Sequence, residues 1–344
     1  VLGGPHARCY PEDAVKYFDY VMGITDEELC RNVLKDCRQY RPVGVNLSAK
    51  SSPKHLPGVR ERWKFISKAL EKTTRLFKVV PMIGSLGCPY TCSFCIDANE
   101  PYQPLDFDAL KEDLRFVLTK IKRPLVSWYD PNFGVRFDDY MNAIEEAVPQ
   151  NSIDFIAESS LSLLSEPHLK RLRDNGFQAL LPGIESWFDM GNKSKTGAKQ
   201  GIDKVNVVSE HINLILSYIP YVQTNFVVGL DSDKGPESFE LTKRFVDKAP
   251  AAFPAYPLIT AFGRAAPLNL EYQSDGRVLP FPFHFLNNSH ASNVKPKNYS
   301  WPEFYDLLIG LAEYSYSWRS IYNRFRATRT TVPRWMNFMR AIST

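Results

Sequence analysis

The chain has 344 residues, 44% of them hydrophobic, and a formal net charge of +4. This length is enough for one barrel-sized domain with appendages, and so small a net charge predicts no nucleic-acid partner. No apolar run approaches the roughly 18 residues that cross a bilayer, and we see no secretory signal, so we predict a cytoplasmic protein without a transmembrane segment. Six cysteines, half of them in one short motif, fit a reducing compartment better than a disulfide framework.

The first 40 residues have the pattern of part of an α/β domain. The predicted elements are a short helix over 11–17, a strand over 18–22 and a helix over 25–37. Thr25 is the candidate cap of the second helix. Gly3 and Gly4 would let the backbone turn closely at the carboxyl end of one strand, and Gly23 at the end of the next, where ligands of parallel sheets bind. Since such a half-domain cannot bury both faces of its sheet, we expect preceding strands to be missing from this sequence.

The middle of the chain alternates apolar, β-rich runs with helical stretches. Residues 41–75 begin rich in proline, serine and lysine and are predicted to be a linker, with a helix near their end. Beyond them, over residues 76–290, we predict strands at 78–83, 125–128, 153–156, 179–181, 223–228 and 256–262. The clearest predicted helices are 109–121, 204–219 and one that Ser165 caps. This alternation predicts a parallel sheet or barrel with outer helices, whose active site lies at the carboxyl ends of the strands.

A helical extension is predicted over residues 291–344. Ser300 and Glu303 form a capping box before apolar residues that repeat at helical spacing as far as Phe325, which predicts one long helix. No acidic residue follows Glu313, whereas six arginines do. A solvated basic face is the favoured interpretation of this tail, and binding of an anionic substrate, a membrane surface or RNA is the alternative.

Three cysteines follow the first strand of the predicted barrel in a C-x3-C-x2-C pattern: Cys88, Cys92 and Cys95. Thiolates so close together can share one metal centre, and soft sulfur ligands select iron–sulfur clusters or zinc. No further cysteine follows, and the nearest one upstream is Cys37. The simplest interpretation is a [4Fe-4S] cluster with one open iron, which is what a reactive centre needs. A zinc knuckle or an accidental trio of buried thiols is the alternative.

The triplet, with Phe94 directly before its last cysteine, resembles the cluster motif of the radical S-adenosylmethionine (radical SAM) superfamily. The resemblance implies an α/β fold, a partial (β/α)6 barrel of the TIM type. In that family the free iron chelates the methionine part of SAM, and reduction releases a 5'-deoxyadenosyl radical that takes a hydrogen atom from the substrate. It also implies a small-molecule substrate and an external one-electron reductant of the flavodoxin or ferredoxin type.

Segments after the later strands resemble the SAM-binding segments of the same family. By this resemblance Asp130 would meet the amino group of SAM, although backbone carbonyls often do this work. The Gly-Ile-Glu-Ser segment that contains Glu185 and Ser186 would present a carboxylate to the ribose hydroxyls or the methionyl end, with Glu158 as a second candidate. Gly229 would lie beside adenine. A carboxylate paired with a barrel arginine is the alternative for Glu185.

Residues 3–7 and 19–23 resemble the end of the Rossmann-like cobalamin-binding domain found before many radical SAM cores. Residues 1–40 would then be its carboxyl-terminal remnant, and Gly3, Gly4 and Gly23 would bind cobalamin, if residues before Val1 complete the domain. We therefore predict a radical SAM enzyme of the methyltransferase type that methylates an unactivated carbon. The alternatives are a radical SAM cyclase or rearrangement enzyme without cobalamin, and a non-catalytic iron–sulfur or zinc binding protein.

Overall fold

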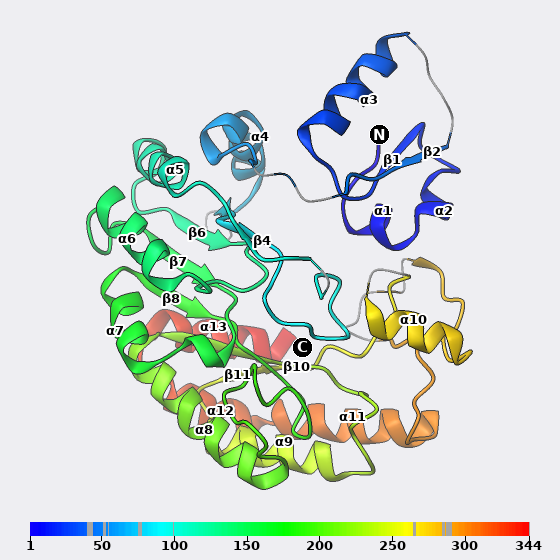
Figure 1. The fold of residues 1–344 in the computed structure, drawn as a ribbon. Helices are drawn as coiled ribbons and strands as arrows, with labels where there is room; N and C mark the ends of the chain where they lie inside the picture. Colours follow the sequence, from blue (N-terminus) through cyan, green and yellow to red (C-terminus); the bar gives the residue numbers. More distant parts are fainter. Residues whose placement is uncertain are drawn as a thin grey trace.

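Six parallel strands form the centre of the molecule, in the order β11-β10-β8-β7-β6-β3 (Figure 1). The computed structural model describes residues 1–39, 44–50, 53, 55–74, 78–98, 100–263, 266–283, 286 and 291–343. The strands are β3 Val79–Met82, β6 Leu125–Trp128, β7 Asp154–Ala157, β8 Phe177–Leu180, β10 Tyr221–Phe226 and β11 Phe253–Ala255, and a short β9, Gly183–Glu185, pairs with β10. Because the strands follow one another in chain order and β3 and β11 stay at opposite edges, the sheet is an open, partial barrel. The predicted fold class is confirmed.

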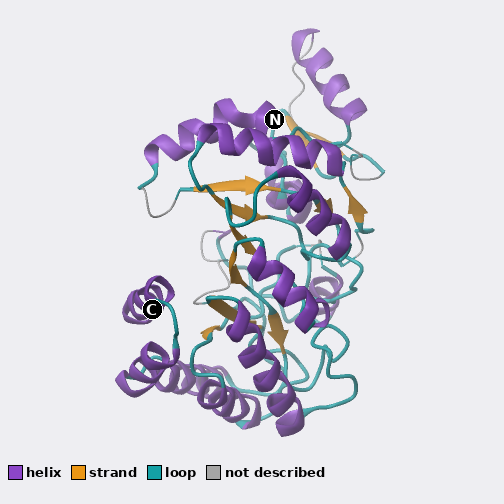
Figure 2. Cartoon of the chain, turned by 90° about the vertical axis from the view of Figure 1, so that its left-hand side faces the viewer, coloured by secondary structure: helices purple, strands orange, loops and turns teal. Residues whose placement is uncertain are grey.

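Helices cover the outer face of this sheet. They are α4 Val59–Lys72, α5 Phe107–Lys120, α6 Phe137–Ala147, α7 Glu166–Asp174, α8 Gly201–Tyr218 and α9 Glu237–Lys248. Alternate residues of each strand face them: Val80 and Met82 of β3 are buried in the same apolar cluster as Leu114 of α5. Burying one such side chain contributes about 1.5–3 kcal/mol. Figure 2 shows the strands from the side as one curved layer. The core therefore lies between strands and helices, and the carboxyl ends of the strands are left for the site.

The last strand of the barrel lies earlier than the sequence predicts. The predicted range 256–262 is apolar, but β11 ends at Ala255, and the described residues 256–262 make a single bridge, between Leu258 and Val228. Ile259 and Ala261 are buried there in a separate apolar cluster at the end of the sheet. Hydrophobicity in this stretch thus reflects packing of a loop, and the pattern alone could not separate that from a strand.

The N-terminal residues form a small parallel sheet of their own. Its elements are α1 Pro5–Cys9, α2 Pro11–Ala14, β1 Tyr20–Met22, α3 Glu27–Gln39 and β2 Val45–Leu47. Leu2 pairs with Val21, and β1 pairs with β2, both in parallel. The predicted cap Thr25 is wrong by one residue, because the Asp26 carboxylate accepts the Leu29 N–H at 2.8 Å. Within residues 41–75, α4 matches the helix predicted near the end of the linker, whereas β2 is a strand that the sequence does not predict.

Two helices, not one, follow the predicted capping box. The reciprocal bonds of Ser300 and Glu303 open α11, Trp301–Ser315, as predicted, but the helix ends at Tyr316 and Ser317 caps a new helix, α12, Trp318–Ala327. The last helix, α13, is Thr331–Ser343, and α10, Pro267–Ser274, precedes them. Ile321 and Ala341 pack against Ala179, Tyr221 and Phe253 of the barrel strands. In the described part of the chain no helix is long and apolar enough to cross a bilayer.

The basic tail is partly internal. Arg324 is buried and donates to the carbonyl oxygens of Ala252 and Ser315. Arg334 donates to the Thr328 carbonyl, and Arg340 donates to Tyr221 and Gln223. Three of the six arginines after Glu313 therefore hold the C-terminal helices to one another and to the barrel, whereas Arg319, Arg326 and Arg329 are exposed.

Candidate active site

The three cysteines lie on a loop that a short hairpin presents beyond the end of β3. Strands β4, Ser85–Leu86, and β5, Gln103–Pro104, pair in antiparallel fashion on either side of this cluster loop, residues 87–102. The Cys88 N–H donates to the Glu100 carbonyl at 3.2 Å, and the Cys95 N–H to the Cys92 carbonyl at 2.9 Å. Gly87 has φ +65°, and a Cβ there would lie 2.2 Å from the Pro101 oxygen. The loop is thus closed so tightly at its base that only glycine fits.

The thiols are partly removed from water and influence one another. Cys92 is buried and Cys88 and Cys95 are half-buried. Burial raises the pKa of the Cys92 and Cys95 thiols, and the positive charge of Lys193 opposes this rise in both. No group of three His, Cys, Asp or Glu side chains in the described ranges is arranged to hold a single metal ion. A [4Fe-4S] cluster has a different requirement, since each thiolate binds its own iron, and three neighbouring soft thiols in one fixed loop fit that donor set.

A buried ion pair lies beside the cysteines. The Glu185 carboxylate, at the end of β9, is 2.5 Å from Lys193 Nζ, and its side chain is only 8% exposed. Burial lowers the pKa of Lys193, but Glu185, Cys92 and Cys95 together raise it further, so the net direction is upward. Glu185 is thus a paired carboxylate, but its partner is a lysine and not the arginine of the predicted alternative, and its contact with SAM stays a prediction. Lys193 was missed because it lies in an irregular loop with no motif around it.

Glu158 extends this charged group from the end of β7. Its side chain reaches solvent, yet desolvation by the surrounding protein raises its pKa, which Lys193 lowers and Glu185 raises. Two carboxylates and one ammonium thus stand near the thiols at the carboxyl ends of β7 and β9. Such a set can bind a ligand that carries both an amino and a carboxylate group.

Asp130, by contrast, is committed to the protein itself. Its carboxylate accepts the Gly84 N–H at 2.8 Å, the Ser85 hydroxyl at 2.6 Å and the Tyr140 hydroxyl. Burial raises its pKa despite these bonds. The hydrogen bonds fix the end of β6 to the turn between β3 and β4, and they favour a structural role for Asp130 over direct binding of an ammonium group.

Ser186 and Gly229 belong to a second buried network, which begins directly after Glu185. The Ser186 hydroxyl lies 3.5 Å from Asp233 Oδ1 and accepts the Phe188 N–H at 3.1 Å. Burial raises the pKa of Asp233 to about 7, and amides of Gly229 and Leu230 partly oppose it. Gly229, with φ +94°, turns the chain after β10 against Phe304. The predicted contact of Ser186 and Gly229 with SAM stays a prediction.

Phe94 packs between the two edges of the barrel. It contacts an apolar cluster that includes Leu230, Ile259 and Ala261, from the chain after β10 and β11. The neighbouring Ser93 carbonyl accepts the Leu268 N–H at 2.9 Å. The cluster loop, which follows β3, therefore reaches the segment after β11 and bridges the open side of the sheet.

The predicted cobalamin-binding glycines stand together at one edge of the N-terminal sheet. Gly3 and Gly4 follow Leu2, and Gly23 follows β1, so both turns lie at carboxyl ends of parallel strands. Gly4, with φ +87°, precedes the first turn of α1. This is the edge where such sheets bind ligands, which fits the predicted role.

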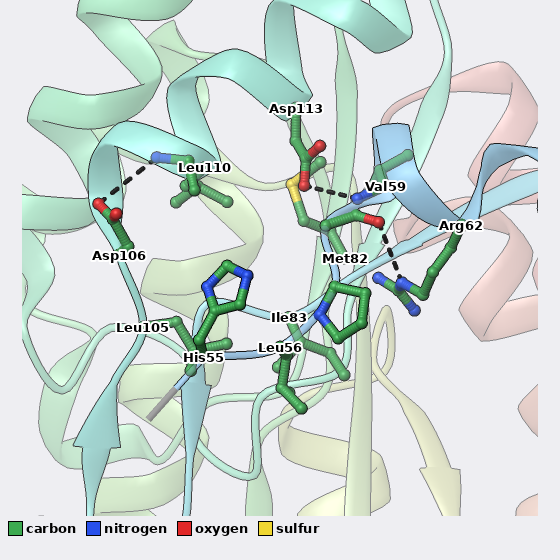
Figure 3. A pocket seen from close by; sticks show the side chains of 13 residues that line it. His55, Leu56, Val59, Arg62, Met82, Ile83, Leu105, Asp106, Leu110 and Asp113 are labelled. Carbon is green, nitrogen blue, oxygen red and sulfur yellow. Dashed lines mark hydrogen bonds between the residues drawn. The ribbon is translucent and has the colours of Figure 1, made fainter. Parts of the chain in front are cut away.

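A cavity of about 230 Å³ lies elsewhere, on the helix side of β3 (Figure 3). His55, Leu56, Met82 and Leu110 line it, and Asp113 at its rim accepts the Val59 N–H at 2.6 Å. Asp113 thus caps the start of α4. The cavity contains none of the predicted site residues, and it follows from the packing of α4 and α5 on β3.

No family model matches the chain. The bacteriochlorophyllide d C-8(2)-methyltransferase of Chlorobaculum tepidum is 24% identical over 342 residues, which cover 93% of this chain and 72% of that protein. The C-12(1)-methyltransferase of the same organism is 22% identical over 191 residues, covering 54% of this chain and 41% of that protein. The solved structure of the cobalamin-dependent S-adenosylmethionine radical enzyme OxsB, with aqua-cobalamin and S-adenosylmethionine bound, superposes with a TM-score of 0.50 at 15% identity, covering 90% of this chain and 47% of that one.

These comparisons agree with the site. The chain spans less than half of the solved structure it resembles, and at this identity the likeness shows the fold. The cysteine loop lies at the carboxyl end of the first barrel strand, and a small parallel α/β sheet precedes the barrel. The resemblance predicted from the sequence is confirmed: the chain has the fold and the cysteine motif of the radical SAM enzymes that carry a cobalamin-binding domain.

Proposed function

We propose that this chain is the core of a cobalamin-dependent radical SAM methyltransferase that acts on an unactivated carbon of a small molecule. The observation that carries the proposal is the cluster loop, with Cys88, Cys92 and Cys95 next to the Glu185–Lys193 pair at the carboxyl end of the barrel. Both curated relatives are named as C-methyltransferases of bacteriochlorophyllide d. A tetrapyrrole is therefore the first substrate class to test.

The chemistry supplied when the groups are bound is reductive cleavage of SAM and transfer of a methyl group. The chain's own residues bind and orient these groups. The three thiolates bind the cluster, and Lys193 offsets their negative charge. Glu185, held by Lys193, and Glu158 present carboxylates to the ligand. Gly3, Gly4 and Gly23 provide the close backbone turns at which cobalamin would bind. An external reductant of the flavodoxin or ferredoxin type would deliver the electron.

Anaerobic reconstitution with iron and sulfide tests this proposal. We expect a reduced [4Fe-4S] signal in the electron paramagnetic resonance spectrum that shifts when SAM is added, and formation of 5'-deoxyadenosine. Cys92→Ala should abolish both without unfolding the barrel, whereas Cys30→Ala, which changes an exposed thiol of α3, should leave both unchanged. A zinc-loaded protein, or a cluster that ignores SAM, would overturn the enzymatic interpretation. With cobalamin added, transfer of a labelled methyl group from SAM separates methylation from other radical reactions.

A further inference from the structure

The N-terminal helix α1 contacts the chain that follows both edge strands of the barrel, β3 and β11, on the side where the cluster loop lies. Figure 1 shows α1 beside the cluster loop and above α10. Arg8 Nη2 donates to the Ile96 carbonyl at 2.9 Å, and its guanidinium lies 3.3 Å from carboxylate oxygens of both Asp97 and Glu100. Ile96, Asp97 and Glu100 all belong to the cluster loop, which follows the edge strand β3.

Residues next to Arg8, at the same carboxyl end of α1, contact the chain that follows the opposite edge strand, β11. The Tyr10 hydroxyl donates to the Ala261 carbonyl at 3.2 Å. Gly263 has φ +56°, and a Cβ there would lie 1.9 Å from the Cys9 oxygen, so the backbones touch directly. The rings of His6 and Tyr10 also contact Phe283, edge-on and tilted, at 5.0 and 4.6 Å between centroids. A helix of five residues thus joins two segments that no strand pairing joins in the described part of the chain.

Arg8 also changes the charge around the cysteines. Asp97 comes two residues after Cys95, and its backbone N–H donates to Cys95 Sγ at 3.4 Å, so its carboxylate lies close to the thiols. Without a partner, Asp97 and Glu100 would place two carboxylates close to three thiolates. Like charges repel one another, and a guanidinium between them weakens this repulsion. The Arg8 side chain is 24% exposed, so these contacts are only partly screened by water.

We propose that α1 is a brace across the open side of the barrel, and that Arg8 is a positioning residue that holds the cluster loop and compensates the charge of its acidic rim. The charge-compensating part rests on the proposed function, since it presumes a bound cluster. The brace does not. Because α1 begins directly after Gly3 and Gly4, it would also tie the predicted cobalamin edge of the N-terminal sheet to the predicted cluster edge of the barrel.

Hydrogen exchange of the cluster-free chain tests the brace. In Arg8→Gln we expect amides of residues 94–98 to exchange about tenfold faster than in wild type, the change that about 1.4 kcal/mol of local stability gives. Amides of α5 and α8, on the outer face, should be unaffected. Arg31→Gln is the matched control, because it removes an exposed arginine whose ion pair, at 2.6 Å, is with Glu27 of the same helix α3. Equal exchange in Arg8→Gln and wild type would overturn the brace.

The midpoint potential of the reconstituted cluster tests charge compensation. Arg8→Gln should make reduction harder, with a more negative potential, because two carboxylates lose their counter-charge. Arg8→Lys should keep a potential near that of wild type, and Arg8→Gln combined with Asp97→Asn should return most of the shift. A role limited to shape would not respond to neutralising Asp97, so a potential that stays low in the double variant would overturn the compensating role. If wild type binds no cluster, the proposed function fails, while the exchange result still decides on the brace.

Discussion

The two sides of the barrel sheet differ in what they bury. Toward the helices, the strands bury apolar side chains such as Val80, Val126 and Phe155. At the carboxyl ends, the same strands lead into buried charges: Asp130, Glu185 and Asp233 are each less than one-tenth exposed. The outer side stabilises the fold through apolar burial. The carboxyl end instead holds groups whose desolvation costs free energy, which a fold retains where a ligand or a reaction requires them.

Asp233 gives the largest expected effect. Its pKa of about 7 in the folded chain exceeds the ordinary value of 3.8, so between these values the folded state keeps a proton that the unfolded state has released. Stability should therefore fall as pH rises across this window and level off above it, by at most about 4 kcal/mol. Asp233→Asn should remove this part of the pH dependence. Urea unfolding of both chains from pH 4 to 8 measures it, and other titrating groups cancel in the difference.

If the free energies of unfolding of wild type and Asp233→Asn differ by the same amount at every pH from 4 to 8, the contrast between the two sides of the sheet is contradicted. Such a constant difference would mean that the carboxylate is not penalised by burial, and that the carboxyl end costs no more than the outer side. Thr224→Val is the control for loss of a buried polar side chain. Thr224 lies in β10, the strand before Asp233, and is fully buried but does not titrate.

The Glu185–Lys193 pair should show a smaller effect on stability. Lys193→Met leaves Glu185 buried without its cation, which costs about 3–5 kcal/mol for a fully buried pair and about 2 kcal/mol here, because Lys193 keeps 21% of its side-chain exposure. Lys193 also lowers the pKa of Cys92, so alkylation of that thiol at pH 8 should slow. Unfolding curves and alkylation rates measure both.

Glu185→Gln added to Lys193→Met should restore most of the lost stability, because no unpaired charge remains. Alkylation of Cys92 should recover only in part, because the Glu185 charge, which raises the pKa of Cys92, is removed, while the larger lowering by Lys193 is still absent. If stability is not restored, the loss came from packing of the lysine stem and not from the buried carboxylate.

Periodicity and local motifs explain which features could be predicted. Strand β6 falls where the alternation of Leu125–Trp128 predicts it, and the cluster loop follows from the spacing of three cysteines. Lys193 lies eight residues beyond Glu185 in an irregular loop, and Arg8 lies about 90 residues before the acidic residues it contacts. No local pattern connects such partners, because only the folded barrel brings them together. The buried charges of the site were therefore found singly, as carboxylates after strands, and not as pairs.

The smallest predicted effect contrasts two serines that the sequence predicts alike as helix caps. The Ser300 hydroxyl accepts the Glu303 N–H, and the Glu303 carboxylate accepts the Ser300 N–H. Ser165 precedes α7 in extended backbone, but its side chain makes no capping bond. Ser300→Ala should therefore lower the free energy of unfolding by about 1 kcal/mol, and Ser165→Ala by less than about 0.5 kcal/mol. Urea midpoints of the two variants, with unchanged slopes, measure the difference. Equal losses would show that the hydroxyl of Ser165 also caps its helix in solution, which would remove the contrast between the two serines.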